Sequence, residues 1–153
     1  MRRDLRARRA TSTNQSGQPT EHSRQRIEAV WRLLDANCNR AREGLRIIED
    51  TARFVLDDAA AAKAFRGYRH QLDELVRTHY RRLLDARRVE TDSGKKNPAQ
   101  PYKNGIPDLL AANFKRCEEA LRVIEEYGRV LSPKAVAKAQ ALRFEIYKWE
   151  KRV

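Results

Sequence analysis

The sequence of 153 residues contains little glycine and proline, with six and five residues respectively. A fold built from many short strands and tight turns needs more of both, because these residues form most turns. The chain also lacks an apolar run long enough to cross a bilayer, and it starts without the apolar stretch of a secretory signal. We therefore expect a helical protein without a membrane segment, located in the cytoplasm.

Cysteine is scarce too, since only Cys38 and Cys117 occur. They stand in helical patterns without a CxxC pair or a Cys/His cluster, which argues against a zinc site and a disulfide framework. We expect both to be small core-facing residues in a reduced cytosol. The sequence also has no GxxxxGK[ST] loop, no nucleophile elbow and no ExxH pair, which argues against a P-loop, an α/β-hydrolase and a di-iron bundle.

Charged residues, in contrast, make up 35% of the chain, and the formal net charge is +12. Residues 1–26 hold seven arginines and two acids, so they contribute +5 of that charge. This segment is polar, aperiodic and almost free of large apolar residues, a composition typical of disorder. We predict a disordered basic tail over residues 1–24 and a single helical domain over residues 25–153.

Four helices are expected in that domain. Apolar residues recur at steps of three, four and seven over residues 27–55, which predicts one face of a long helix. A second helix is expected over residues 59–86, and together they form a first hairpin over residues 25–87. Residues 88–106 carry glycine and proline without apolar periodicity and are expected to form a loop. A loop of this length inside a domain is usually functional or disordered.

The second hairpin is expected over residues 107–153, with a third helix from about Pro107 to Leu131 and a fourth to the end of the chain. Two short signals mark helix starts. Asp57-Asp58 breaks the first apolar pattern and is suited to capping the second helix, and Ser132-Pro133 opens the fourth.

The two hairpins repeat one another. The stretch NCNRAREGLRIIED begins at Asn37 and NFKRCEEALRVIEE at Asn113, an offset of 76 residues, and nine of twenty positions over residues 36–55 are identical at this offset. With a turn shorter by two residues, Tyr68-Arg69 aligns with Leu142-Arg143. Two such hairpins packed about a pseudo-twofold axis predict an all-α domain resembling a four-helix bundle.

Polar residues are repeated along with apolar ones, although a solvated helix face tolerates drift. Asn37 and Asn113 fall inside the apolar faces, where an amide without partners costs about 1–3 kcal/mol. One interpretation is a polar core layer with salt bridges around it. The other is a pocket near the twofold axis, rich in arginine and suited to a phosphate. Periodicity leaves both open. The flanking candidates are Arg40, Glu43, Arg116 and Glu119.

A second repeated set lies on the other side of the first helix. Arg46, Glu49 and Arg53 are spaced by three and four residues, which favours ion pairs within the helix.

At this point the residues resemble a known family. LLDANCNRAREGLRIIEDTARFVLDD (residues 33–58), YRHQL and AANFKRCEEALRVIEEYGRVL (residues 111–131) are similar to the helical domain often fused ahead of thiamine-phosphate synthase in bacteria. That family is understood as a monofunctional hydroxymethylpyrimidine-phosphate kinase of thiamine biosynthesis. The resemblance covers nearly all of residues 27–153. It includes an acidic-x-Gly turn at Asp92-Ser93-Gly94, whereas KKNPAQPYKNGIP departs from the family pattern. The βα-barrel synthase is absent, so its activity is not expected.

The resemblance implies that the protein phosphorylates 4-amino-5-hydroxymethyl-2-methylpyrimidine phosphate to the diphosphate, with ATP as co-substrate and Mg²⁺ as cofactor. The acceptor oxygen is already an anion, so catalysis would consist mainly of positioning and charge neutralisation. We expect the two repeated arginines to clamp phosphates and the two glutamates to orient them or hold Mg²⁺ through water; no metal ligand is assigned. Substrate contacts are expected from Asn37, Asn113, Asp92, Lys95 and Lys96, with the two lysines closing as a lid.

Two other functions are compatible with the sequence. A non-catalytic helical module that binds a thiamine-phosphate synthase partner would need no active site. A basic helical nucleic-acid-binding protein would use the high positive charge, but acids are interleaved through both repeats, which argues against a stripe that follows phosphates.

Overall fold

The computed structural model describes residues 18, 20–92, 94, 103–131 and 133–152. These residues form five α-helices and no strand, which confirms the all-α prediction. No helix within this part of the chain is long and apolar enough to cross a membrane. The helices are α1 (Glu21–Phe54), α2 (Ala59–Arg77), α3 (Tyr80–Ala86), α4 (Ile106–Leu131) and α5 (Pro133–Glu150).

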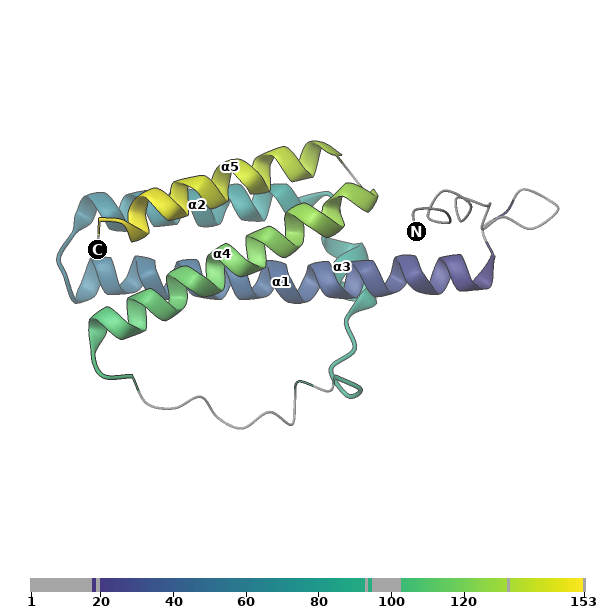
Figure 1. Ribbon diagram of the computed structural model, residues 1–153, viewed down its shortest axis with the longest axis horizontal. Helices are drawn as coiled ribbons and strands as arrows, with labels where there is room; N and C mark the ends of the chain where they lie inside the picture. The colour runs from purple at the N-terminus through teal and green to yellow at the C-terminus, as the bar shows by residue number, and fades with distance from the viewer. Residues whose placement is uncertain (1–17, 19, 93, 95–102, 132, 153) are drawn as a thin grey trace, which may run out of the picture.

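The arrangement is two helical hairpins joined by a long connection. α1 pairs with α2 and α4 pairs with α5, while α1 and α4 cross each other and α2 contacts α5 more lightly (Figure 1). Each helix turns an apolar face inward, and the aromatic centre of the core joins Phe65 to Phe114 and Trp149 at ring-centroid distances of 5.8 and 5.4 Å. The predicted bundle of duplicated hairpins is therefore confirmed.

Capping residues fix two helix starts. The Asp58 side chain accepts the Ala61 N–H at 2.8 Å and caps α2, as the sequence predicts. The Thr20 hydroxyl accepts the Ser23 N–H at 3.3 Å and caps α1. Because α1 begins at Glu21, residues 21–24 of the predicted tail are helical. The rest of that tail, residues 1–17 and 19, lies outside the described residues.

The helix expected over residues 59–86 is in fact two helices, so this prediction is wrong. α2 ends at Arg77, and α3 starts at Tyr80 after a turn at Thr78-His79. The turn redirects the chain so that α3 packs on α1. The His79 ring lies 5.2 Å from the Trp31 ring, and Leu83 is buried in the core. Packing of His79 and Leu83 against α1 stabilises the break between α2 and α3. The spacing of apolar residues along the sequence does not reveal such a break.

The pseudo-twofold relation extends to two buried ion pairs. Glu49 is 1% exposed and accepts hydrogen bonds from Arg69 and Arg66, each at 3.0 Å. At the equivalent position Glu125 is 0% exposed and pairs with Arg143. Arg69 and Arg143 are the residues that the repeat alignment matches, so this alignment of the second helices is confirmed.

The pairs of Glu49 correct the prediction that this residue pairs within its own helix. Glu49 bonds across to α2 because its side chain points into the hairpin, and Arg46 pairs with Asp50 instead, at 2.9 Å. The Arg53 guanidinium lies 4.6 Å from the Phe54 ring centroid. Burial by itself raises the pKa of Glu49, but hydrogen bonds from Arg69 and Arg66 outweigh it, and the net pKa is lowered.

The crossing of α1 and α4 is unusually close at Gly44. A Cβ added there would lie 2.6 Å from Cys117 Sγ and 3.2 Å from the Asn113 carbonyl oxygen. Cys117 Sγ in turn lies 3.6 Å from the Ala41 carbonyl oxygen. Ala41 and Cys117 are equivalent in the two repeats, so the pseudo-twofold axis passes near this contact.

We expect Gly44→Ala to destabilise the protein by about 1–3 kcal/mol, because the added methyl overlaps atoms of α4. The matched control is Gly67→Ala in α2, where nothing lies within 4 Å of the added Cβ. That change should stabilise the fold by about 0.5–1 kcal/mol through helix propensity alone. Urea unfolding of both variants measures the difference. Equal stability of Gly44→Ala and wild type would contradict the close packing.

Both cysteines lie in the core, as predicted, with exposed fractions of 4% for Cys38 and 0% for Cys117. Burial raises the pKa of each thiol to about 12. A raised pKa keeps the thiols protonated at neutral pH, as expected for core residues.

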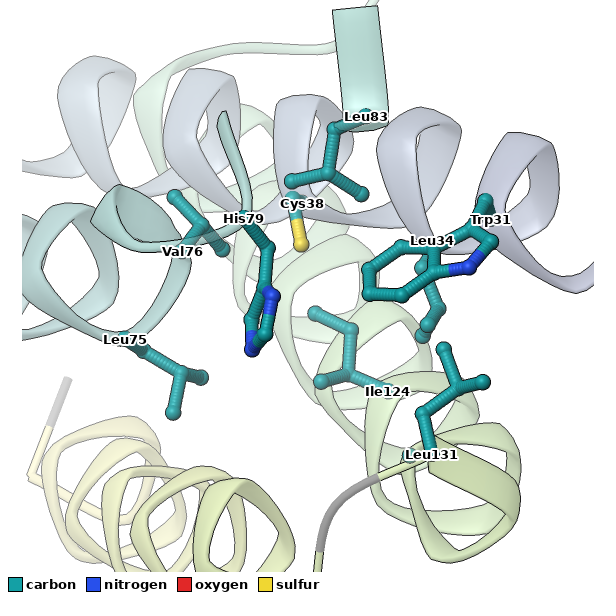
Figure 2. Close-up of a pocket in the computed structure, with 10 residues that line it drawn as sticks. Trp31, Leu34, Cys38, Leu75, Val76, His79, Leu83, Ile124 and Leu131 are labelled. Carbon is teal, nitrogen blue, oxygen red and sulfur yellow. The ribbon is translucent and has the colours of Figure 1, made fainter. Parts of the chain in front are cut away.

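A small apolar cavity adjoins Cys38 between α1, the α2–α3 turn and α4. Figure 2 shows Trp31 and His79 facing each other across it, with Ile124 and Leu131 contributed by α4. Its volume is about 50 Å³. A cavity that holds a benzene ring measures about 150 Å³. This cavity is therefore too small to hold an aromatic ring of that size.

Candidate functional site

A groove lined by polar and apolar residues runs along α1. α1 contributes a long wall with residues between Glu21 and Glu43, and the segment between Asp85 and Gly94 contributes a second wall. Two residues of α4, Val123 and Tyr127, complete the lining. Arginines and carboxylates occur on both walls, so the groove offers charges of both signs to a ligand.

The repeated polar residues of the first repeat, Asn37, Arg40 and Glu43, line this groove, and we call them the polar set of that repeat. Asn37 is 6% exposed; its Nδ2 donates to the Leu33 carbonyl oxygen at 2.9 Å, and its Oδ1 accepts from Arg40 Nη1 at 3.5 Å. The Arg40 guanidinium therefore lies next to the buried amide. Arg40 and Glu43 are exposed, and neither forms an ion pair with any other residue that the structure describes. The groove therefore holds an arginine whose charge no acid among the described residues neutralises through an ion pair.

The polar set of the second repeat lies outside this lining. Asn113 is 4% exposed and its Nδ2 donates to the Leu109 carbonyl oxygen at 2.8 Å, as in the first repeat. Its Oδ1 has no hydrogen-bond partner in the described ranges. Arg116 and Glu119 are exposed and lack ion pairs within the same ranges. Both asparagines are buried as predicted, but only the first set belongs to the groove.

Asp92 is the remaining predicted residue that the groove contains. Its Oδ1 accepts the Gly94 N–H at 2.9 Å, which closes the acidic-x-Gly turn expected from the sequence. Lys95 and Lys96 lie outside the described residues, so their role as a lid stays a prediction.

An ion pair that the sequence analysis missed holds the two walls together. Asp35, 7% exposed on α1, accepts two hydrogen bonds of 2.7 Å from Arg87 Nε and Nη2. Arg87 follows the last residue of α3, so this bidentate pair fixes the start of the segment that carries Asp92. The equivalent of Asp35 in the second repeat is Ala111. An acid on an apolar helix face, without a counterpart in the other repeat, is the signal that could have revealed it.

Tyr127 was also missed. It lies in the groove lining with 42% of its surface exposed, and Val123 is one helical turn before it on α4. Together they offer an apolar surface with an aromatic ring beside the polar set. The corresponding residue of the first repeat is Thr51, so the ring is a second departure from symmetry.

The residues that line the groove also decide whether a magnesium ion could bind there. The described parts of the chain contain no group of three or more His, Cys, Asp or Glu residues able to hold a metal ion. A Mg²⁺ ion that arrives with substrate phosphates needs only one or two protein carboxylates. Glu43 and Asp92 present such oxygens to the groove, so the donor set fits a magnesium ion carried by a phosphate ligand.

The structure thus combines an all-α fold with a groove that is lined by both arginines and carboxylates. The model of the ThiD2 family matches residues 32–152, and the chain therefore belongs to the ThiD2 family. No solved structure matches it.

Several thiamine-phosphate synthases are relatives. That of Synechococcus sp. (strain CC9605) is 42% identical over 123 residues, which cover 79% of this chain and 34% of the relative. That of Nostoc punctiforme (strain ATCC 29133 / PCC 73102) is 38% identical over 135 residues, covering 87% and 38%. The chain thus spans about a third of the length of these relatives.

Proposed function

We propose that the protein acts in thiamine biosynthesis as a kinase that phosphorylates hydroxymethylpyrimidine phosphate to the diphosphate with Mg-ATP. The observation that carries this proposal is Arg40, which is exposed beside the buried Asn37 and has no ion pair among the described residues, in a groove of a ThiD2-family chain. The names of the relatives support the pathway, because a thiamine-phosphate synthase makes thiamine phosphate.

The groove offers what this reaction requires. A phosphate oxygen of the pyrimidine substrate attacks the γ-phosphorus of ATP, a new P–O bond forms, and the bond to the bridging β–γ oxygen breaks, so that ADP leaves with the electron pair. No proton has to be removed from an anionic oxygen, so the protein supplies positioning and positive charge. In this proposal Arg40 neutralises charge on the transferred group, and Glu43 and Asp92 hold the magnesium ion directly or through water.

The apolar part of the groove suits the pyrimidine ring. Tyr127 and Val123 of α4 line the same groove as Asn37 and Arg40 of α1. In this proposal the pyrimidine ring packs on Tyr127 and its phosphate lies among the arginines of the groove. Arg116 and Glu119 stay candidates for a second phosphate contact near the twofold axis.

The kinase is tested by following ADP release. We expect ADP to appear only when pyrimidine phosphate and Mg-ATP are both present, with one diphosphate formed for each ADP. Omitting either substrate or chelating magnesium should stop the reaction, because the metal neutralises the transferred phosphates. A coupled ADP assay together with mass analysis of the product makes the measurement. ADP release at the same rate without the pyrimidine would contradict the proposal.

The length of the relatives favours one alternative, a module that supports a thiamine-phosphate synthase without catalysis of its own. The matched region fills only 34–38% of those proteins, so it is accompanied there by a longer segment. Such a module would release no ADP, and it would co-elute with a synthase during size-exclusion chromatography. A chain that shows the kinase reaction in isolation excludes this alternative.

A further inference from the structure

Arginines extend along the groove beyond the predicted site. Arg24, Arg32 and Arg40 line it from α1, and Arg88 lines it from the segment that follows α3. We call these four residues the arginine row. On α1 they occur at intervals of eight residues, which corresponds to a rise of about 12 Å between successive members. Nothing in the repeat pattern singles out Arg24, Arg32 or Arg88.

The acids around the row are largely neutralised by other partners. Glu28 pairs with Arg82, Asp35 with Arg87, and Asp85 with Arg81. The members of the row, in contrast, form no ion pair with the residues that the structure describes. The groove thus holds four arginines without an ion pair among the described residues, together with three lining acids, Glu21, Glu43 and Asp92, that likewise form none there. The arginines outnumber these acids, which favours an anion that carries more than one charge.

The spacing decides between a single phosphate and an extended anion. Arginines about 12 Å apart along one helix are too widely separated for one phosphate group to bind two of them closely. A chain of linked phosphates, in contrast, reaches from one guanidinium toward the next and to the facing wall. The ion pair between Asp35 and Arg87 fixes that wall immediately before Arg88, so the two sides hold a defined separation.

We propose that Arg24, Arg32 and Arg88 bind the polyphosphate chain of a nucleotide. This inference rests on the proposed function. It places the phosphoryl donor in the part of the groove nearer the start of α1, and the pyrimidine phosphate at Asn37 and Glu43. Arg40 lies between the two. Donor and acceptor then share one groove of the first repeat instead of occupying two sites related by the twofold axis.

Binding of ATP and of inorganic triphosphate to the full chain, measured by calorimetry, tests the proposal without requiring turnover. We expect Arg32→Gln and Arg88→Gln each to weaken both ligands about tenfold or more, the loss typical of a charged hydrogen bond. The matched control is Arg77→Gln, which removes the same charge from an exposed position of α2 outside the groove. It should change either affinity by less than about twofold. Thermal melting confirms that each variant is folded.

Three results would overturn the proposal: no binding of either ligand to wild type, an equal loss with Arg77→Gln, or unchanged affinity in both groove variants. A short RNA that binds more tightly than ATP and depends on the same arginines would also overturn it, in favour of a nucleic-acid site. ATP and triphosphate of equal affinity support recognition of phosphates alone, and tighter ATP supports an added contact with the nucleoside. Binding of ATP through Arg32 without ADP release would refute the proposed kinase and leave this inference intact.

Discussion

Arg40→Lys is expected to lower kcat/KM for the pyrimidine phosphate about tenfold to a thousandfold, or about 1.4–4 kcal/mol of transition-state stabilisation. Lysine keeps the charge but loses the planar fork that can hold two phosphate oxygens. Because Arg40 is exposed, the melting temperature should change by no more than about 2 °C. Steady-state kinetics and thermal melting of the same preparation measure both effects.

The duplication supplies the matched control for this experiment. Arg116 is the equivalent residue, and the contact between Ala41 and Cys117 places the two arginines on either side of the helix crossing. Only Arg40 lines the groove. We therefore expect Arg116→Lys to have the smaller effect on kcat/KM. Equal losses in both variants would favour a site on the twofold axis, whereas wild-type kinetics in both would contradict the role proposed for these arginines.

The fold could be predicted from the sequence because apolar periodicity and an internal repeat report the same packing. The inward faces of the helices, the hairpin pairing and the Asp58 cap all follow from spacing and local chemistry. The break before α3 could not be predicted, because it depends on how His79 and Leu83 pack against α1. Tertiary contacts outweigh helix propensity there.

The repeated polar residues were harder to interpret, because spacing does not state which neighbour a side chain meets. Glu49 was expected to pair within its helix, and it instead bonds to Arg69 on α2. Glu118 went unnoticed although it is 6% exposed, with Oε2 bonded to Lys115 and Oε1 without a hydrogen bond among the described residues. Burial raises the pKa of this carboxyl. The spacing of residues along one helix does not show which residues of a neighbouring helix pack against such a group.

The groove itself arises from departures between the repeats. Symmetry alone gives two similar polar sets, at Asn37 and at Asn113. Only the first hairpin has the additional α3 helix, and only α1 has the acid Asp35 that anchors Arg87. These features add a second wall beside the set at Asn37. Among the described residues, no such wall stands beside the set at Asn113. A search for differences between the repeats, in addition to identities, therefore narrows the candidate site.

The buried ion pair of the second hairpin carries the largest expected effect on stability. Arg143 donates to both carboxylate oxygens of Glu125, and the Arg143 side chain is 9% exposed. The guanidinium also lies 5.0 Å from the Phe144 ring centroid and donates to the Tyr147 hydroxyl at 2.8 Å. These aromatic residues, although exposed themselves, pack against the pair and reduce its contact with water.

Glu125→Ala is expected to destabilise the protein by about 3–5 kcal/mol, because it leaves the Arg143 charge buried without its partner. For a domain of this size the melting temperature should fall on the order of 10–20 °C. Asp50→Asn is the control, since Asp50 forms an exposed pair with Arg46 and its loss should cost less than about 1 kcal/mol. Chemical unfolding of each variant at neutral pH gives the free energies.

A double variant, Glu125→Gln with Arg143→Met, separates the cost of an orphaned charge from the value of the pair itself. Replacing both partners removes the buried charge, and such replacements are often close to neutral. We therefore expect the double variant to regain much of the stability that Glu125→Ala loses. If the double variant is as unstable as Glu125→Ala, the loss comes from packing at this site, and the account based on an unpaired guanidinium is wrong.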